Sequence, residues 1–125
     1  AIQVVSREAG APERLVFEQT ILQSDRLART AVIMPGNRAV ADFVAANPGA
    51  IGYLSMALAD SGVKSVALDG VLPTPETVSQ AGYPLSLPLI VITRHAIADK
   101  TRAFVEFALA PEGQEIVGQI SGRLH

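Results

Sequence analysis

The hydrophobic positions of the chain fall into short apolar runs and into stripes at helical spacing. The apolar, β-prone runs have the length of buried strands and cover residues 2–5, 31–34, 50–54, 63–68 and 89–92. Apolar residues recur every three or four positions, the spacing of one helix face, over residues 12–23, 37–46, 98–109 and 111–120. This alternation predicts an α/β domain with a central sheet of four to five strands, the first being residues 2–5.

Capping and turn residues indicate where several of these elements begin. Pro12 suits the first turn of a helix, where its missing N–H costs nothing. Asn37, after the turn pair Pro35 and Gly36, can cap the next helix. Thr74 followed by Pro75 has the form of a third helix start, with Thr74 as the N-cap and the helix ending near residue 82.

Composition limits the classes of function. The 125 residues are 49% hydrophobic and 18% charged, which is typical of a folded domain. The net charge of -2 disfavours nucleic acid as a partner. The absence of cysteine excludes a disulfide scaffold, a thiol nucleophile and cysteine-based metal sites. No apolar run is long enough to span a membrane.

Catalytic signatures are missing from the sequence. It contains no GxGxxG, GxxxxGK[ST], GxSxG or HExxH motif, and no pair of carboxylates is brought together by local spacing. The two histidines, His95 and His125, lie thirty residues apart, and His95 fits a solvated residue at a strand end better than a base. We therefore predict a protein that is not an enzyme, with no catalytic residue, no metal and no cofactor.

One constellation has the form of an anion site. Ser6 and Arg7 end the first strand, a loop of small residues including Gly10 follows, and a helix begins near Pro12. An arginine beside backbone N–H groups at a helix start can bind an anion. On the other reading, Arg7 is a strand-end charge paired with Glu8 or Glu13, and spacing alone favours this one.

Two further segments also have two readings each. Tyr53 follows a turn and a short apolar run, so its ring is expected to pack and its hydroxyl to form a hydrogen bond, although it could also line a ligand cleft. Residues 83–88 contain two prolines, so they suit a linker between lobes as well as an edge strand.

Taken in order, several motifs of the chain resemble those of the phosphate-type solute-binding proteins of bacterial ABC importers, which are PstS-like. Any one motif is weak, but the ordered series is specific and nearly spans the chain. The motifs are Ser6-Arg7-Glu8-Ala9-Gly10 with Phe17-Glu18, Asn47-Pro48-Gly49-Ala50-Ile51-Gly52-Tyr53, Leu68-Asp69-Gly70-Val71-Leu72-Pro73-Thr74, Tyr83-Pro84-Leu85-Ser86, and Pro111-Glu112-Gly113-Gln114.

The resemblance implies a periplasmic-binding-protein-like (type II) lobe, with a central mixed sheet flanked by helices, as a single domain over residues 1–125. Residues 1–82 would correspond to the second lobe, and residues 83–125 to a crossing strand and C-terminal helices that pack on a first lobe. Most of that first lobe is absent, so we expect the chain to be a fragment or a degenerate form. The apolar faces of residues 89–92, Phe104 and Phe107 then need cover, either from the tail folding back or from another chain such as a second copy in a homodimer.

The resemblance also implies a function. The partners would be phosphate or a similar oxyanion and the permease of an ABC transporter, and the location would be periplasmic or extracellular, with membrane anchoring of the full-length form left open. Ser6, Arg7 and Gly10 match the family's anion-binding residues. The family continues with Ser-Gly-Thr where this chain has Ala11, Pro12 and Glu13, so we expect weak phosphate binding.

A second hypothesis is a lobe with a degenerate binding site that acts as a self-associating protein-interaction or sensory module. The sequence Ala11-Pro12-Glu13 favours it. Residues 39–92 carry only five charged side chains, as a surface that meets a partner would, and this also favours it.

Overall fold

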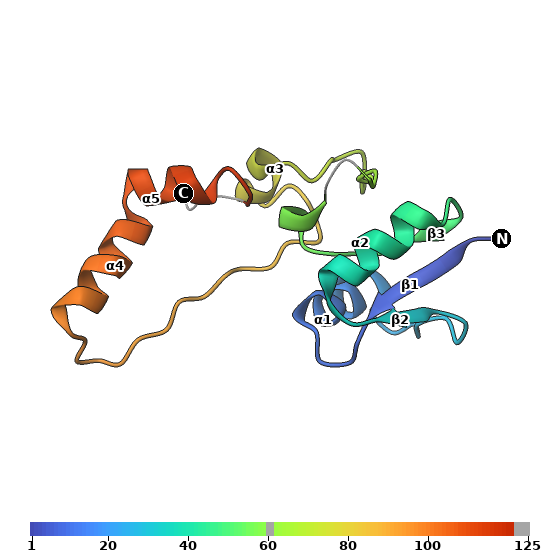
Figure 1. Ribbon diagram of the computed structural model, residues 1–125, viewed down its shortest axis with the longest axis horizontal. Coiled ribbons are helices and arrows are strands. Elements are labelled where there is room, and N and C mark those ends of the chain that lie inside the picture. The colour runs from blue at the N-terminus through green and yellow to red at the C-terminus, as the bar shows by residue number, and fades with distance from the viewer. Residues whose placement is uncertain (60–61, 122–125) are drawn as a thin grey trace.

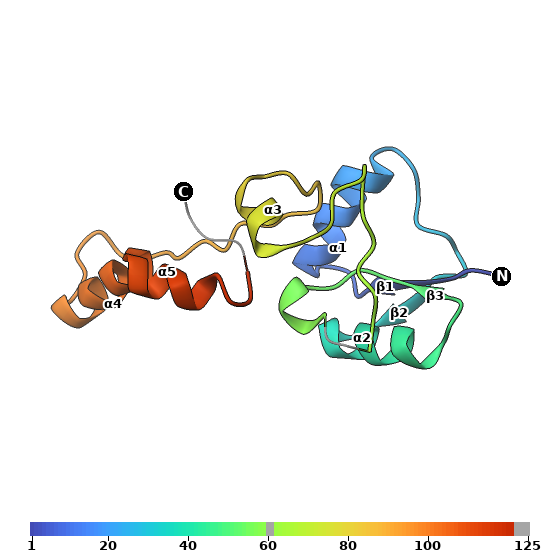
Figure 2. The same cartoon turned by 90° about the horizontal axis from the view of Figure 1, so that it is seen from above.

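The computed structural model describes residues 1–59 and 62–121, which form a sheet-containing part and an arm (Figure 1). The sheet and the helices next to it lie at one end of the molecule. The C-terminal arm, residues 83–121, leads away from them in extended conformation and ends in α4 (Asp99–Leu109) and α5 (Pro111–Val117). The same separation is seen from above (Figure 2). The tail therefore does not fold back on the sheet.

The sheet of the described residues has three parallel strands in the order β2-β1-β3. The central strand β1 (Gln3–Arg7) pairs with β2 (Val32–Met34) in the register Val5 to Val32, and with β3 (Ala50–Ile51) in the register Gln3 to Ala50. Parallel strands joined by helices confirm the α/β class. The three strands of the described sheet pair in parallel, whereas a mixed sheet was expected.

Two of the expected strands are not part of the sheet. Residues 63–68 end in a tight turn in which Asp69 and Gly70 both have positive φ (50° and 80°), and one antiparallel bridge joins Leu68 to Val71. An Asp-Gly pair favours such a two-residue turn, so this run reverses at once instead of crossing the sheet. Residues 89–92, which follow two prolines, extend into the arm without belonging to a strand. The prediction of four to five strands was therefore wrong, because residues 63–68 and 89–92 do not join the described sheet.

The helices largely follow the pattern of apolar residues. Pro12 starts α1 (Pro12–Phe17), which continues as the π-helix η1 (Glu18–Leu22). After β2 comes α2 (Gly36–Ala46), whose N-cap is Pro35. Asn37 therefore lies inside the helix, so its expected role as N-cap was wrong. The 3-10 turn η2 (Met56–Leu58) follows β3.

Thr74 caps α3 (Pro75–Ser79), as the sequence predicted. The Oγ1 atom of Thr74 accepts a hydrogen bond from the backbone N–H of Thr77 at 3.2 Å, and the Thr77 hydroxyl accepts one from the Thr74 N–H at 2.9 Å. This reciprocal pair satisfies two backbone donors at the helix start. The helix ends at Ser79 and is therefore shorter than expected from the sequence, which placed its end near residue 82.

The hydrophobic core lies between β1 and α2. Val5 and Val40 are fully buried, and Ala41 and Ala11 are nearly so. Gly52 lies close to the same two valines, since a Cβ at that position would come within 3.0 Å of Val40 and 3.3 Å of Val5. The core is small, and it fixes the end of β1 against α2.

The C-terminal arm leaves large apolar side chains exposed. Leu89 and Ile92 are 93% and 87% exposed, and Phe104 is 65% exposed. The accessible surface of 9131 Å² exceeds the roughly 6,400 Å² expected of a compact chain of this mass. Within the arm, α4 and α5 pack together closely at Gly113, where a Cβ would come within 2.1 Å of the Phe107 carbonyl oxygen.

We expect Val5→Ala to lower the free energy of unfolding by about 2 kcal/mol, because it removes two buried methyl groups and leaves a cavity. Urea denaturation followed by circular dichroism measures the change. The matched control is Val66→Ala, since Val66 is 54% exposed and its truncation should change stability by less than about 0.5 kcal/mol. Equal effects of the two substitutions would contradict a core centred on β1 and α2.

Candidate functional site

Arg7 is the last residue of β1, and it lies at the carboxyl end of the central strand. In open parallel sheets, ligands bind at this edge. The residue is only 6% exposed, although it carries a charge. A buried guanidinium needs acceptors for its N–H groups, and the surrounding loops and helices supply them.

Glu8, the next residue, holds one side of the guanidinium with both carboxylate oxygens. The Nε atom of Arg7 donates to Oε2 of Glu8 at 2.8 Å, and Nη2 donates to Oε1 at 2.9 Å. The backbone N–H of Gly36, at the start of α2, also donates to Oε2 at 3.3 Å. Paired bonds of this kind are among the stronger interactions of arginine.

Glu13 and Asn37 hold the other side of the guanidinium. The Nη1 atom of Arg7 lies 3.1 Å from Oε2 of Glu13 and donates a hydrogen bond to Oδ1 of Asn37. The side-chain amide of Asn37 in turn donates to Oε1 of Glu13 at 2.8 Å. The loop after β1, the first turn of α1 and the first turn of α2 are thus joined at Arg7. The interpretation of Arg7 as a charge paired with Glu8 or Glu13 is confirmed, and both carboxylates take part.

Ser6 belongs to a separate hydrogen-bonded group on the other side of the strand end. Its hydroxyl lies 2.6 Å from the hydroxyl of Tyr53, and the backbone N–H of Arg7 also donates to that hydroxyl, at 3.4 Å. The Tyr53 ring stacks on Phe17 with centroids 4.4 Å apart. The expectation that Tyr53 packs its ring and forms a hydrogen bond is confirmed.

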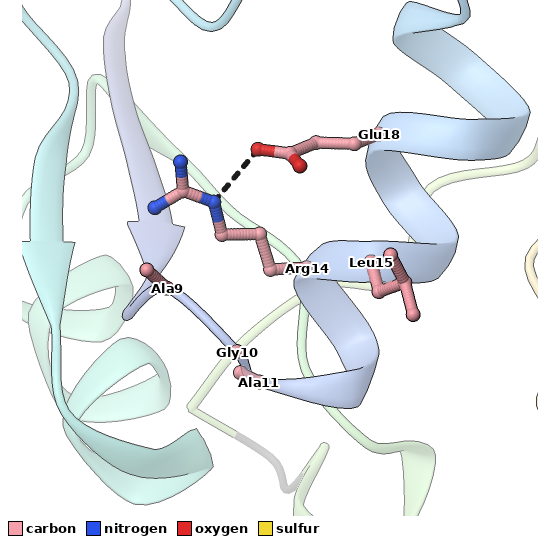
Figure 3. A pocket seen from close by; sticks show the side chains of 6 residues that line it. All are labelled: Ala9, Gly10, Ala11, Arg14, Leu15 and Glu18. Carbon is pink, nitrogen blue, oxygen red and sulfur yellow. Dashed lines mark hydrogen bonds and ion pairs between the residues drawn. The ribbon is translucent and has the colours of Figure 1, made fainter.

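Gly10 lies in the loop between β1 and α1. Its φ of 88° belongs to the left-handed region that favours glycine, while a Cβ there would meet no atom within 4 Å. Gly10 helps to line a cavity of about 160 Å³ together with Ala9, Ala11, Arg14, Leu15 and Glu18 (Figure 3). Arg14 and Glu18 form an ion pair of 2.7 Å in its wall. Gly10 therefore shapes the loop beside Arg7, Glu8, Glu13 and Asn37, which together are called the Arg7 cluster.

The charges of the Arg7 cluster shift the pKa values of its members. The hydrogen bond from Arg7 is the main reason why the pKa of Glu8 falls from 4.5 to about 2. Burial raises the pKa of Glu13, but the hydrogen bond from Asn37 and the charge of Arg7 outweigh it, so that this pKa lies below its ordinary value. The hydrogen bond to Glu8 raises the pKa of Arg7. One positive and two negative charges therefore meet at the site.

The segment after Gly10 offers few groups to an anion. Ala11 and Pro12 carry no hydroxyl, and Pro12 has no backbone N–H. The N-cap position of α1 is Ala11, which makes no side-chain cap. The carboxylate of Glu13, the next residue, already forms an ion pair with Arg7.

Asn37 is the residue of the site that the sequence reading missed. Its position at a helix start gave a signal for a cap, and its contact with Arg7 arises because β2 pairs beside β1 and brings α2 to the same edge. His95 is exposed on the arm, and His125 lies outside the described residues. Within residues 1–59 and 62–121, no cluster of three potential metal ligands is found, and no helix is long and apolar enough to cross a membrane.

The parallel sheet with flanking helices, and a buried arginine at its carboxyl edge, define an α/β lobe. A family model described as PBP superfamily domain matches residues 1–112. The chain therefore belongs to the PBP superfamily. This confirms the resemblance to periplasmic binding proteins that the ordered motifs indicated.

Curated relatives of the chain include phosphate-binding proteins. The chain is 32% identical to the phosphate-binding protein PstS 2 of Streptococcus pneumoniae over 93% of this chain and 43% of the relative. The corresponding protein of Streptococcus agalactiae is 27% identical, over the same shares of the two chains. The chain thus spans less than half the length of these curated relatives.

Solved structures give the same result. A phosphate ABC transporter substrate-binding protein from Clostridium perfringens, with bound phosphate, matches with a TM-score of 0.85 and 33% identity over 99% of this chain and 52% of that one. A phosphate-binding protein from Streptococcus pneumoniae matches with a TM-score of 0.76 and 29% identity over 94% of this chain and 49% of that one. The likeness to PstS-like solute-binding proteins extends to the arm.

We expect the folded state to lose stability as the pH falls from about 4.5 toward 2. The pKa of Glu8 is lowered to about 2 in the folded state, so its contribution is present above the unfolded pKa and is lost as Glu8 takes up a proton. Urea denaturation at a series of pH values measures this slope. Glu8→Gln should make the slope shallower, whereas Glu106→Gln, on the exposed surface of α4, should leave it unchanged. An identical slope in the Glu8 variant would show that the ion pair with Arg7 does not form.

Proposed function

We propose that the chain is part of a phosphate-type solute-binding protein of an ABC importer, and that it is not an enzyme. Arg7 is the charge partner of the anion, while Ser6 and Gly10 shape the loop around it. The observation that supports the proposal most directly is a buried arginine at the carboxyl edge of the central strand in a chain whose structural relative from Clostridium perfringens holds phosphate. The partner in transport is the permease, and the location is periplasmic or extracellular.

We also propose that residues 1–82 form one lobe and that residues 83–125 cross to a second lobe. The separation of the C-terminal arm from the sheet supports this division (Figures 1 and 2). The chain covers 43% of its curated relatives and 52% of a solved one, which leaves room in those proteins for a further lobe. Such a lobe would cover the apolar residues that the arm exposes.

We expect inorganic phosphate to bind weakly, with a Kd above about 0.1 mM, which corresponds to less than about 5.5 kcal/mol of binding free energy. The hydroxyls and the N–H of the family's Ser-Gly-Thr are missing, and each hydrogen bond to a charged group contributes about 1.5–3 kcal/mol. The carboxylates of Glu8 and Glu13 already hold Arg7. Chemical-shift titration of the amide signals with phosphate measures affinities in this range.

The matched pair for this titration is Arg7→Gln and Arg94→Gln, which remove the same charge from a buried and from an exposed position. Arg7→Gln should abolish the phosphate-dependent shifts, while Arg94→Gln should keep them. A dispersed spectrum shows that the variant is folded. Phosphate binding that survives in a folded Arg7 variant would refute the assignment of this site.

A second candidate function is self-association through the arm. It is supported by the exposure of residues 89–92 and by Phe104 and Phe107, which are 65% and 48% exposed. The accessible surface of the chain exceeds that of a compact chain of the same mass by about 2,700 Å². This excess is larger than the roughly 800 Å² that each partner buries in an interface of standard size. A second copy of the chain can supply that cover as a homodimer.

We expect size-exclusion chromatography with light scattering to give at least a dimer at high protein concentration, because exposed apolar surface favours association. Ile92→Asp should return the chain to a monomer, since it places a charge in the exposed apolar run of the arm. Leu72→Asp serves as the control, because Leu72 is 52% exposed and lies outside the arm. A monomer at every concentration would contradict self-association.

A further inference from the structure

Glu13 contacts the same groups that a small oxyanion at this site would contact. Its Oε1 atom accepts a hydrogen bond from the side-chain amide of Asn37 at 2.8 Å. Its Oε2 atom is buried and lies 3.1 Å from Nη1 of Arg7. A carboxylate with one oxygen on a guanidinium and the other on an amide donor occupies two sites that a phosphate or sulfate oxygen could use.

Two of the other N–H groups of Arg7 are already paired. Glu8 accepts hydrogen bonds from Nε and from one N–H of Nη2, at 2.8 and 2.9 Å. At the Nη1 atom, Glu13 and Asn37 meet, so an anion that uses this edge of Arg7 meets both of them. An oxyanion can bind Arg7 at Nη1 only if Glu13 moves away.

Glu13 is also the member of the cluster best placed to move without unfolding the sheet. The Arg7 side chain is 8% exposed, whereas that of Glu13 is 23% exposed and lies on the first turn of a short helix. Its carboxylate is held by the side-chain amide of Asn37 and by the ion pair with Arg7. Rotation of its side chain toward solvent would free Nη1 of Arg7 and the Asn37 amide together, and would also remove a negative charge from the site.

We infer that Glu13 is an internal ligand of Arg7, whose carboxylate competes with free oxyanions and sets the affinity of the site for them. The inference rests on the proposed anion-binding function of Arg7. It attributes the weak binding expected for phosphate to a displaceable side chain, in addition to the hydroxyls and the N–H that the loop lacks. Affinity then depends on the charge of residue 13 even when Ala11 and Pro12 are unchanged.

The test is a titration with inorganic phosphate of the protein and of its Glu13→Gln variant at constant pH and ionic strength. The glutamine keeps an oxygen for the Asn37 amide but loses the charge that pairs with Arg7. The variant should bind phosphate at least about tenfold more tightly, a change of about 1.4 kcal/mol. Glu76→Gln, an exposed carboxylate of α3, changes the net charge equally and should leave the affinity within about twofold.

A second variant, Glu13→Thr, guards against a folding defect specific to glutamine, and thermal unfolding of each variant reports whether it is folded. Affinity unchanged in both folded variants would overturn the inference. The Arg7→Gln variant separates this failure from that of the proposed function. If Arg7→Gln abolishes phosphate binding while the Glu13 variants bind no more tightly, Arg7 binds the anion and Glu13 does not compete. If Arg7→Gln binds phosphate as the parent does, both proposals fail.

Discussion

The burial of one guanidinium at the end of the central strand is the constraint on which this site depends. A charged side chain that is 6% exposed is stable only if acceptors replace the water that it loses. Glu8, Glu13 and Asn37 come from the loop after β1, from α1 and from α2, so satisfying Arg7 also fixes how these segments meet. Removal of one acceptor would leave buried charge and loosen this junction, so the cluster holds the segments around it together.

The same constraint gives the residues around Arg7 a net negative charge, which repels an approaching anion. In the folded state the pKa values of Glu8 and Glu13 are lowered, so both carboxylates are ionised at neutral pH and the cluster carries a net negative charge. An anion that approaches Arg7 must overcome this charge as well as replace existing contacts. If Arg7 pairs with an anion as proposed, a lobe of the PBP superfamily can keep its fold and its arginine while the residues around the arginine set its affinity for that anion.

The sequence predicted local features well and long-range pairing poorly. Pro12 and Thr74 act through the backbone of their neighbours, so the helix starts at these residues could be predicted directly. Whether residues 63–68 or 89–92 become strands depends on whether a partner strand lies beside them, which the apolar pattern does not contain. At the site, Arg7 and its carboxylates lie within seven residues and could be paired from the sequence. Asn37 could not, because its contact requires the order β2-β1-β3.

The close contact at Gly113 has a consequence for how the arm meets a partner. A side chain larger than hydrogen would strike the carbonyl of Phe107, so glycine is needed for α4 and α5 to pack this closely, and the helical hairpin that bears Phe104 is formed by the arm alone. Binding such a preformed hairpin costs little conformational entropy, whereas the extended residues 89–92 must be ordered when a neighbour covers them. The arm therefore combines a closely packed helical hairpin, α4 and α5, with the extended residues 89–92.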